Sequence, residues 1–197
     1  MSQQSAKFAS QFAELFEKVS SERFLAKTSV SNEVPFFVWP YAPHQHHAVQ
    51  DGIITLTRRL EGAGVPVLTL PLYEVCMDFF EEDELVSDIA DLEKSGDYEA
   101  LHEAVRSVLD WDLVLRPRLE ARFAERPNAR VTFVTQIGQV YPYLRSGELL
   151  NRMQVIATDT PTVFFYPGTY DQKAISLFGE LPSEKYYRAF NLNDYRV

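Results

Sequence analysis

The sequence predicts an α/β protein: a single three-layer domain with a mainly parallel five-stranded sheet, Rossmann-like or degenerate P-loop-like, plus an N-terminal helix. Short runs of apolar, β-forming residues alternate with helical stretches of a dozen or more residues, the order that βαβ crossovers produce. The chain has 197 residues, which fits one domain, and 46% of them are hydrophobic, enough for a buried core. We expect one domain over residues 1–197, with a helical segment at 1–30 and the core at 34–191.

The first 70 residues predict two helices and two strands. An apolar stripe at helical spacing marks the opening helix, which must pack against the domain. This stripe consists of Phe8, Phe12, Leu15, Phe16 and Val19. Residues 34–39 and 65–70 are apolar runs rich in β-forming side chains, each followed by a proline, which predicts two buried strands. Between them, residues 44–60 repeat apolar side chains at helical spacing and end before Gly62, so a helix connects the strands.

The rest of the chain predicts a helical middle followed by three further strands. Residues 75–94 and 98–123 have helical patterns that give two or three helices. Pro117 should kink or split the last one, because proline lacks an N–H donor and clashes with the preceding turn. A further helix is expected at residues 144–156. The remaining predicted strands are 131–135, 162–166 and 186–192.

The charge distribution argues against autonomous, tight binding to nucleic acid. The formal net charge is −9, whereas neutralisation of phosphates by Lys and Arg supplies most non-specific affinity. Residues 1–128 carry 12 Lys and Arg against 22 Asp and Glu, while residues 129–197 carry 7 against 6. The near-neutral C-terminal third leaves direct DNA contact as a disfavoured alternative.

The single cysteine, Cys76, excludes an intramolecular disulfide and a zinc site built from several thiolates. The sequence contains no run of about 18 apolar residues that could span a bilayer, and no apolar signal segment. We therefore expect a cytoplasmic protein without a membrane partner. Cys76 itself lies on an apolar helical pattern, which favours a buried, unreactive thiol.

The motifs of common enzymes are missing from the sequence. No G-x-x-x-x-G-K-[ST] loop occurs, no predicted strand ends in an acidic residue that could hold Mg²⁺, and there is no G-x-S-x-G elbow. His44, His46 and His47 form the one histidine cluster, but no Cys or carboxylate lies nearby in the sequence, and polar residues that open a helix are usually solvated. We therefore expect no enzyme: no catalytic residue, no cofactor and no metal site.

Ligands of open parallel sheets bind beyond the carboxyl ends of the strands, so the segments after the predicted strands form the candidate site. These segments are aromatic and rich in proline. The candidate rim for a partner or ligand consists of Tyr41, His44, Tyr73, Glu74, Tyr141, Arg145, Tyr166, Gly168, Tyr170 and Asp171. Arg145 allows two readings: a structural ion pair with Asp171 or Glu74, or contact with a phosphate, a carboxylate or a partner. The acidic run 81–84 is either a solvated helix face or a patch for a partner.

Four segments of the chain resemble the BrxB family, whose members are encoded in bacteriophage exclusion (BREX) loci of bacteria and archaea. The segments are QVYPYLRSGELLN at 139–151, PTVFFYPGTYD at 161–171, LFGEL at 177–181 and YYRAF at 186–190. The resemblance covers roughly residues 34–191, and its specific motifs lie in 139–191.

The resemblance implies a core subunit of an anti-phage defence system that works beside a PglX-type DNA methyltransferase, a large BrxC-type P-loop ATPase and a phosphatase-superfamily protein, PglZ. It implies no established catalytic activity, so Tyr141, Arg145, Tyr166 and Asp171 enter as candidates for structure or contact. The leading hypothesis is a non-catalytic adaptor that docks by its aromatic rim or acidic helical face, onto PglZ as the first expectation and the ATPase as the second. The alternative is a nucleotide- or phosphate-binding regulatory module that uses Arg145 and the backbone of the Gly168 loop.

Overall fold

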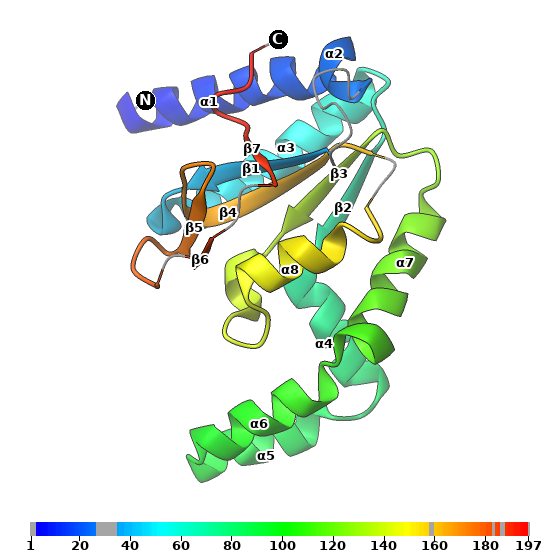
Figure 1. The fold of residues 1–197 in the computed structure, drawn as a ribbon, viewed down its shortest axis with the longest axis vertical. Helices are drawn as coiled ribbons and strands as arrows, with labels where there is room; N and C mark the ends of the chain where they lie inside the picture. Colours follow the sequence, from blue (N-terminus) through cyan, green and yellow to red (C-terminus); the bar gives the residue numbers. More distant parts are fainter. Residues whose placement is uncertain (1–2, 27–34, 158–159, 183, 186–187, 197) are drawn as a thin grey trace.

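A central sheet of five parallel strands runs through the protein in the order β2–β3–β4–β1–β7 (Figure 1). The computed structural model describes residues 3–26, 35–157, 160–182, 184–185 and 188–196. The five strands are β1 (Phe36–Tyr41), β2 (Val67–Pro71), β3 (Val131–Thr135), β4 (Thr162–Tyr170) and β7 (Phe190–Asn191). Each neighbouring pair is parallel, which confirms the predicted α/β class with a mainly parallel sheet.

The described part of the chain forms eight α-helices. They are α1 (Gln3–Ser20), α2 (Glu22–Leu25), α3 (His46–Gly62), α4 (Leu72–Glu82), α5 (Val86–Ser95), α6 (Tyr98–Val108), α7 (Arg116–Glu125) and α8 (Ser146–Met153). Shorter 3₁₀ turns cover Pro43–Gln45 and Ile137–Val140, and a π-helical turn covers Trp111–Leu115.

Side chains that alternate along the strands divide the core into two layers. On β1, Phe37 and Trp39 pack with α1, α2 and α3, while Phe36 and Val38 pack on the opposite face with α4, α7 and α8. Both layers are made of large buried apolar side chains, as expected when helices cover both faces of a parallel sheet. The three-layer arrangement is therefore visible in the burial pattern itself.

The predicted N-terminal helix is confirmed as α1, and it is docked on the sheet. The ring of Phe12 lies edge-on to Trp39 with centroids 5.2 Å apart. The Lys18 ammonium, itself buried, donates to the carbonyls of Leu192 at 3.0 Å and Asn193 at 2.9 Å. These bonds tie α1 to the segment that follows β7.

The sheet also carries an antiparallel extension that was not predicted. The strand β4 continues to Tyr170, beyond the predicted end at residue 166, and its last residues pair with β5 (Ala174–Leu177). β5 in turn pairs with β6 (Glu184–Lys185). The predicted strand 186–192 was too long: β7 spans two residues, and 186–187 lie outside the described residues.

The helical middle contains four helices, α4 to α7, where two or three were predicted. The pattern over 75–94 breaks after α4, where Glu84 has a φ of 57° in the left-handed region. The pattern over 98–123 breaks at Leu109, and Asp110 caps the next turn by accepting a hydrogen bond from the Leu113 N–H at 2.8 Å. Pro117 lies in the first turn of α7, where a missing N–H costs little.

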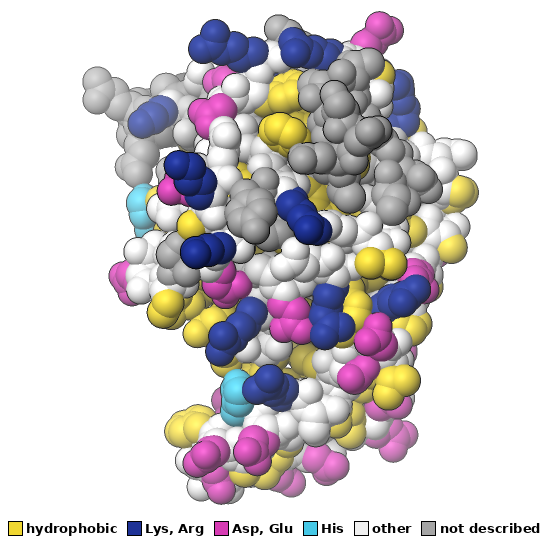
Figure 2. Space-filling view, viewed as in Figure 1, with side chains coloured by type: hydrophobic (Ala, Val, Ile, Leu, Met, Phe, Trp, Pro, Cys, Tyr) yellow, Lys and Arg dark blue, Asp and Glu magenta, His cyan; other side chains and the backbone are white. Residues whose placement is uncertain are grey.

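Helices α5 and α6 lie at one end of the molecule, away from the sheet (Figure 1). Asp and Glu side chains gather over this end of the surface (Figure 2). The segment 72–108, which contains α4, α5 and α6, carries 12 Asp and Glu against 2 Lys and Arg, whereas the rest of the chain carries 16 against 17. The excess negative charge of the protein is therefore concentrated on these three helices.

None of the helices in the described part of the chain is both long enough and apolar enough to cross a membrane.

Candidate functional site

Tyr41, Tyr166 and Tyr170 of the predicted rim are buried and support the fold. Tyr41 places its hydroxyl 3.0 Å from Nδ1 of His46, and Tyr170 donates to the carbonyl of Ala189 at 2.5 Å. Burial raises the pKa of Tyr41 far above its usual value because the charged form is disfavoured. His44 lies exposed on the 3₁₀ turn next to β1. These residues therefore do not converge on one surface site.

Glu74 is held by Gln136 rather than by an arginine. Gln136 Nε2 donates to Glu74 Oε1 at 2.7 Å, and the Glu74 N–H donates to Gln136 Oε1 at 3.2 Å. Gln136 has a φ of 61°, a left-handed backbone that few residues other than glycine adopt. The paired hydrogen bonds join the start of α4 to the end of β3.

Asp171 and Gly168 shape the β4–β5 hairpin. Asp171 Oδ1 accepts hydrogen bonds from the N–H groups of Lys173 at 3.0 Å and Ala174 at 2.9 Å. These bonds favour the carboxylate and hold the pKa of Asp171 below its usual value. A Cβ on Gly168 would clash with the carbonyl oxygen of Ser176 on β5. Of the two readings of Arg145, the structural ion pair with Asp171 or Glu74 was wrong, because neither carboxylate lies within ion-pair distance of its guanidinium.

A buried polar cluster lies where β4, α8 and β6 meet. Burial raises the pKa of Tyr166 to about 12, although its hydrogen bond to Ser146 acts in the opposite direction. The nearby carboxylate of Glu184 adds to the increase. Glu184 Oε2 also accepts a hydrogen bond from the Gly147 N–H at 2.9 Å, which fixes the start of α8.

Arg145 lines a polar cleft of about 640 Å³ between α6, α8 and the loop after β3. We call this the arginine cleft; the described residues that line it are His102, Arg106, Leu109, Asp110, Trp111, Tyr141, Pro142, Tyr143, Leu144, Arg145, Glu148, Leu149 and Arg152. Arg152 donates to Glu148 at 2.9 Å and lies 3.7 Å from an oxygen of Asp112. By contrast, neither Arg106 nor Arg145 has an ion-pair partner among the residues that the structure describes.

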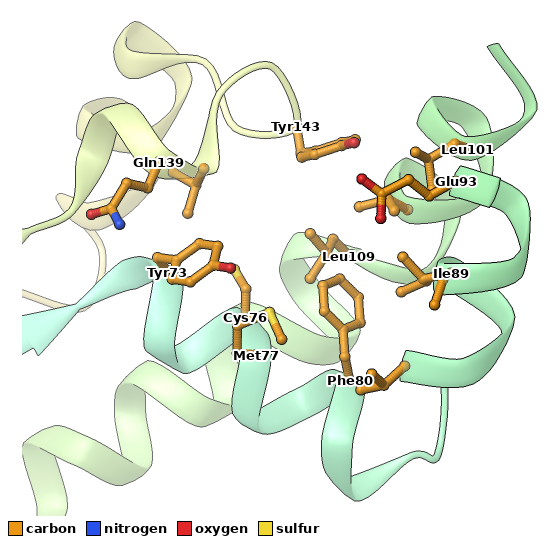
Figure 3. A pocket seen from close by; sticks show the side chains of 14 residues that line it. Tyr73, Cys76, Met77, Phe80, Ile89, Glu93, Leu101, Leu109, Gln139 and Tyr143 are labelled. Carbon is orange, nitrogen blue, oxygen red and sulfur yellow. The ribbon is translucent and has the colours of Figure 1, made fainter. Parts of the chain in front are cut away.

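A second cavity, of about 320 Å³, lies between α4 and the α5–α6 pair (Figure 3). We call this the apolar groove; it is lined by Tyr73, Cys76, Met77, Phe80, Val86, Ile89, Ala90, Glu93, Leu101, Val105, Leu109, Gln139, Val140 and Tyr143. Tyr73 and Val86 are 41% and 42% exposed, a high fraction for large apolar side chains. In Figure 3, the α4 side chains face Ile89 and Leu101 across the groove. Of the predicted rim, this groove contains only Tyr73.

The chemistry available at the groove and around the histidines is limited. Burial raises the pKa of the Cys76 thiol to about 12, so the thiol stays protonated near neutral pH. Partial burial lowers the pKa of His46, and the neighbouring His47 lowers it further by charge repulsion. In the ranges that the structure describes, no group of three or more His, Cys, Asp or Glu could hold a metal ion.

The sequence alone did not point to the apolar groove or to most of the arginine cleft. Arg106 and His102 are on α6, whereas Arg145 and Arg152 follow β3, and these segments meet because the loop after β3 reaches across to α6. The ring of His102 stacks on Tyr143 with centroids 5.3 Å apart. The sequence held one signal for the apolar groove. Residues 72–108 are strongly acidic, as expected of exposed helices, yet they also carry more apolar side chains than exposed helices require.

Comparison with known proteins gives one consistent result. The family model described as BREX protein BrxB matches residues 68–192. The chain is 31% identical over 186 residues to a protein described as BREX protein BrxB from Bacillus cereus (strain H3081.97), covering 92% of this chain and 95% of that protein. It is 24% identical over 180 residues to another from Escherichia coli O9:H4 (strain HS), covering 91% and 88%. No solved structure matches the chain significantly.

Proposed function

Since the chain belongs to the BrxB family of BREX proteins, we propose that it is a non-catalytic adaptor subunit that holds another BREX protein in its apolar groove. The predicted family resemblance is confirmed, and with it a role within a BREX system. The absence of catalysis and the identity of the partner belong to the proposal.

The apolar groove is the observation that carries this proposal. Tyr73 and Val86 stay exposed at its mouth, and Met77 and Phe80 lie deeper among apolar neighbours. A concave apolar surface of this kind gains free energy when a partner removes it from water, and aromatic side chains dominate binding hot spots. Methionine adds adaptability, because its unbranched side chain repacks around different partners.

The surroundings of the groove define the chemistry of the partner. Within the segment 72–108, acidic side chains outnumber basic ones by 12 to 2, and Glu93 lies in the lining itself. A complementary partner therefore presents an apolar helix face flanked by Lys or Arg, the arrangement of a helix bound in a groove. This observation favours the acidic helical face over the aromatic rim as the docking surface.

The surroundings of the thiol and of the carboxylates support the proposal that the protein is not a catalyst. The Cys76 thiol is buried and protonated, and the carboxylates of Asp171 and Glu184 accept hydrogen bonds from backbone N–H groups. Glu74 uses its side chain for Gln136 instead of a substrate. These groups do not form a pair of nucleophile and base within hydrogen-bond distance, which covalent catalysis requires.

The partner is expected to be the PglZ-type protein first and the BrxC-type ATPase second, with the PglX-type methyltransferase as part of the wider assembly. A pull-down of the purified protein with each subunit, one at a time, tests this order. We expect retention of the PglZ-type subunit by the protein alone. Failure of every single subunit to bind would contradict the adaptor function.

A further inference from the structure

We propose that the arginine cleft binds the phosphate group of a small phosphorylated ligand. This cavity is distinct from the apolar groove, although Leu109 and Tyr143 line both. The cleft is polar and has a volume of about 640 Å³, within the range of small-ligand sites.

The charges in the cleft leave two guanidinium groups available. Arg152 is neutralised by Glu148 and Asp112 and packs over the ring of Trp111 at 5.6 Å. Asp110 is used as a helix cap, through its bond from the Leu113 N–H. Among the described residues, Arg106 and Arg145 are thus the cleft arginines without an ionic partner.

Two arginines from different elements suit a dianion. Arg106 belongs to the last turn of α6, and Arg145 directly precedes α8, so they approach the cleft from two elements. A guanidinium presents a planar fork of N–H donors that matches phosphate oxygens, and charge-assisted bonds of this type are stronger than neutral ones. A phosphate monoester carries close to two negative charges near neutral pH, which the pair can balance.

Aromatic side chains provide the rest of the site. Tyr141, Tyr143 and Trp111 line the cleft, and Tyr143 is fixed by its stacking on His102. The Tyr141 ring, which is 37% exposed, offers an apolar face and a hydroxyl group to the organic part of a phosphate ester. The cleft therefore suits an ester with a sugar or a base better than a bare anion.

The neighbouring charge favours a compact ligand over a nucleic acid. His102 and Arg106 of the cleft belong to the segment 72–108, which carries 12 Asp and Glu and only 2 Lys and Arg, one of them Arg106. Beyond the two arginines, a nucleic acid would be repelled by these acidic side chains. It would also find no row of Lys and Arg in the segment 72–108 to neutralise its phosphates. A small ester meets only the cleft.

Isothermal titration calorimetry of the full chain with adenosine monophosphate, ribose 5-phosphate and inorganic phosphate tests the proposal. We expect saturable binding of at least one ester, weakened about tenfold or more by Arg106→Ala and by Arg145→Ala, which corresponds to about 1.4 kcal/mol each. Tighter binding of the nucleotide than of ribose 5-phosphate would show that the base contributes.

The control is Arg58→Ala, which removes an exposed guanidinium of α3 that has no ion-pair partner among the described residues. This variant should bind as the wild type does, and the melting temperatures of all three variants should stay close to that of the wild type. The proposal is overturned if no probe binds below about 10 mM, if Arg58→Ala weakens binding as much as the cleft variants do, or if a short single-stranded oligonucleotide binds more tightly than the esters.

Discussion

The carboxylate of Glu184 accepts a hydrogen bond from the backbone N–H of Gly147 at 2.9 Å. The bond joins β6, at the end of the antiparallel extension, to the first turn of α8. A carboxylate in this position satisfies a helix N–H that has no intrahelical acceptor and interacts favourably with the helix dipole. Gly147 permits this approach, because a Cβ there would clash with the same oxygen.

We predict that Glu184→Ala lowers the free energy of unfolding by about 1–2 kcal/mol, because an N–H of α8 loses its charged acceptor. Gly147→Ala should cost about 1–3 kcal/mol, since the new methyl group displaces Glu184. The measurement is urea unfolding of each variant. In the double variant the two losses should not add, and fully additive losses would show that the residues do not interact.

Gly168 is a structural residue of the hairpin, so we expect Gly168→Ala to destabilise the protein by about 1–3 kcal/mol. Its Cβ would clash with the Ser176 carbonyl of the paired strand. The matched control is Gly62→Ala, because a Cβ at the end of α3 meets nothing within 4 Å. Thermal unfolding that leaves Gly168→Ala as stable as Gly62→Ala would contradict the hairpin geometry.

We predict that the protein loses the stability contributed by Asp171 at low pH. Its folded pKa lies below the usual value because the N–H groups of Lys173 and Ala174 stabilise the carboxylate. The Asp171 carboxylate therefore contributes fully to the free energy of unfolding above the pKa of an aspartate in the unfolded chain, about 3.9. This contribution is lost as the pH falls through the lower pKa of Asp171 in the folded protein. An NMR titration of the Asp171 carboxyl carbon measures the shift directly. A midpoint at or above the ordinary value would contradict the two hydrogen bonds.

Association with the partner should depend on salt. Raising the ionic strength from about 0.1 M to about 1 M shortens the Debye length from roughly 10 Å to 3 Å, which screens the acidic field of residues 72–108. We expect the association rate to fall about tenfold while the apolar contacts remain. Stopped-flow mixing measures this rate.

The matched variants for the salt experiment remove two exposed carboxylates each. Glu81→Gln with Glu93→Gln, near the groove, should slow association at low salt and reduce its salt dependence. Glu17→Gln with Asp51→Asn, on α1 and α3, should change neither. Equal effects of the two pairs would place the binding surface elsewhere.

The core of the fold could be predicted from the sequence because local patterns determine it. The run at 131–135 is a strand with the same bounds in the structure, and the stripe from Phe8 to Val19 identifies α1. The short strands β5 and β6 could not be predicted, because their pairing depends on where the chain folds back after β4. Such contacts leave no periodicity in the sequence.

The candidate site was predictable only in part, for the same reason. Arg145 was identified by its place after a strand, yet its neighbour Arg106 comes from a helix whose position depends on the break at Leu109. The predicted rim contained Tyr41, Tyr166 and Tyr170, which the structure buries as supports of the fold. A strand end indicates where a site can form, but the side chains that reach it depend on the packing of the loops.

The affinity of the protein for the PglZ-type subunit tests the adaptor function most directly. Val86→Glu places a charge at the mouth of the apolar groove, whereas Ile54→Glu places one at a comparably exposed position, 50% against 42%, on α3. Calorimetry should give a dissociation constant at least about tenfold higher for Val86→Glu, a loss of about 1.4 kcal/mol. Ile54→Glu should bind as tightly as the wild type. Equal affinity of Val86→Glu and the wild-type protein would contradict docking in the groove.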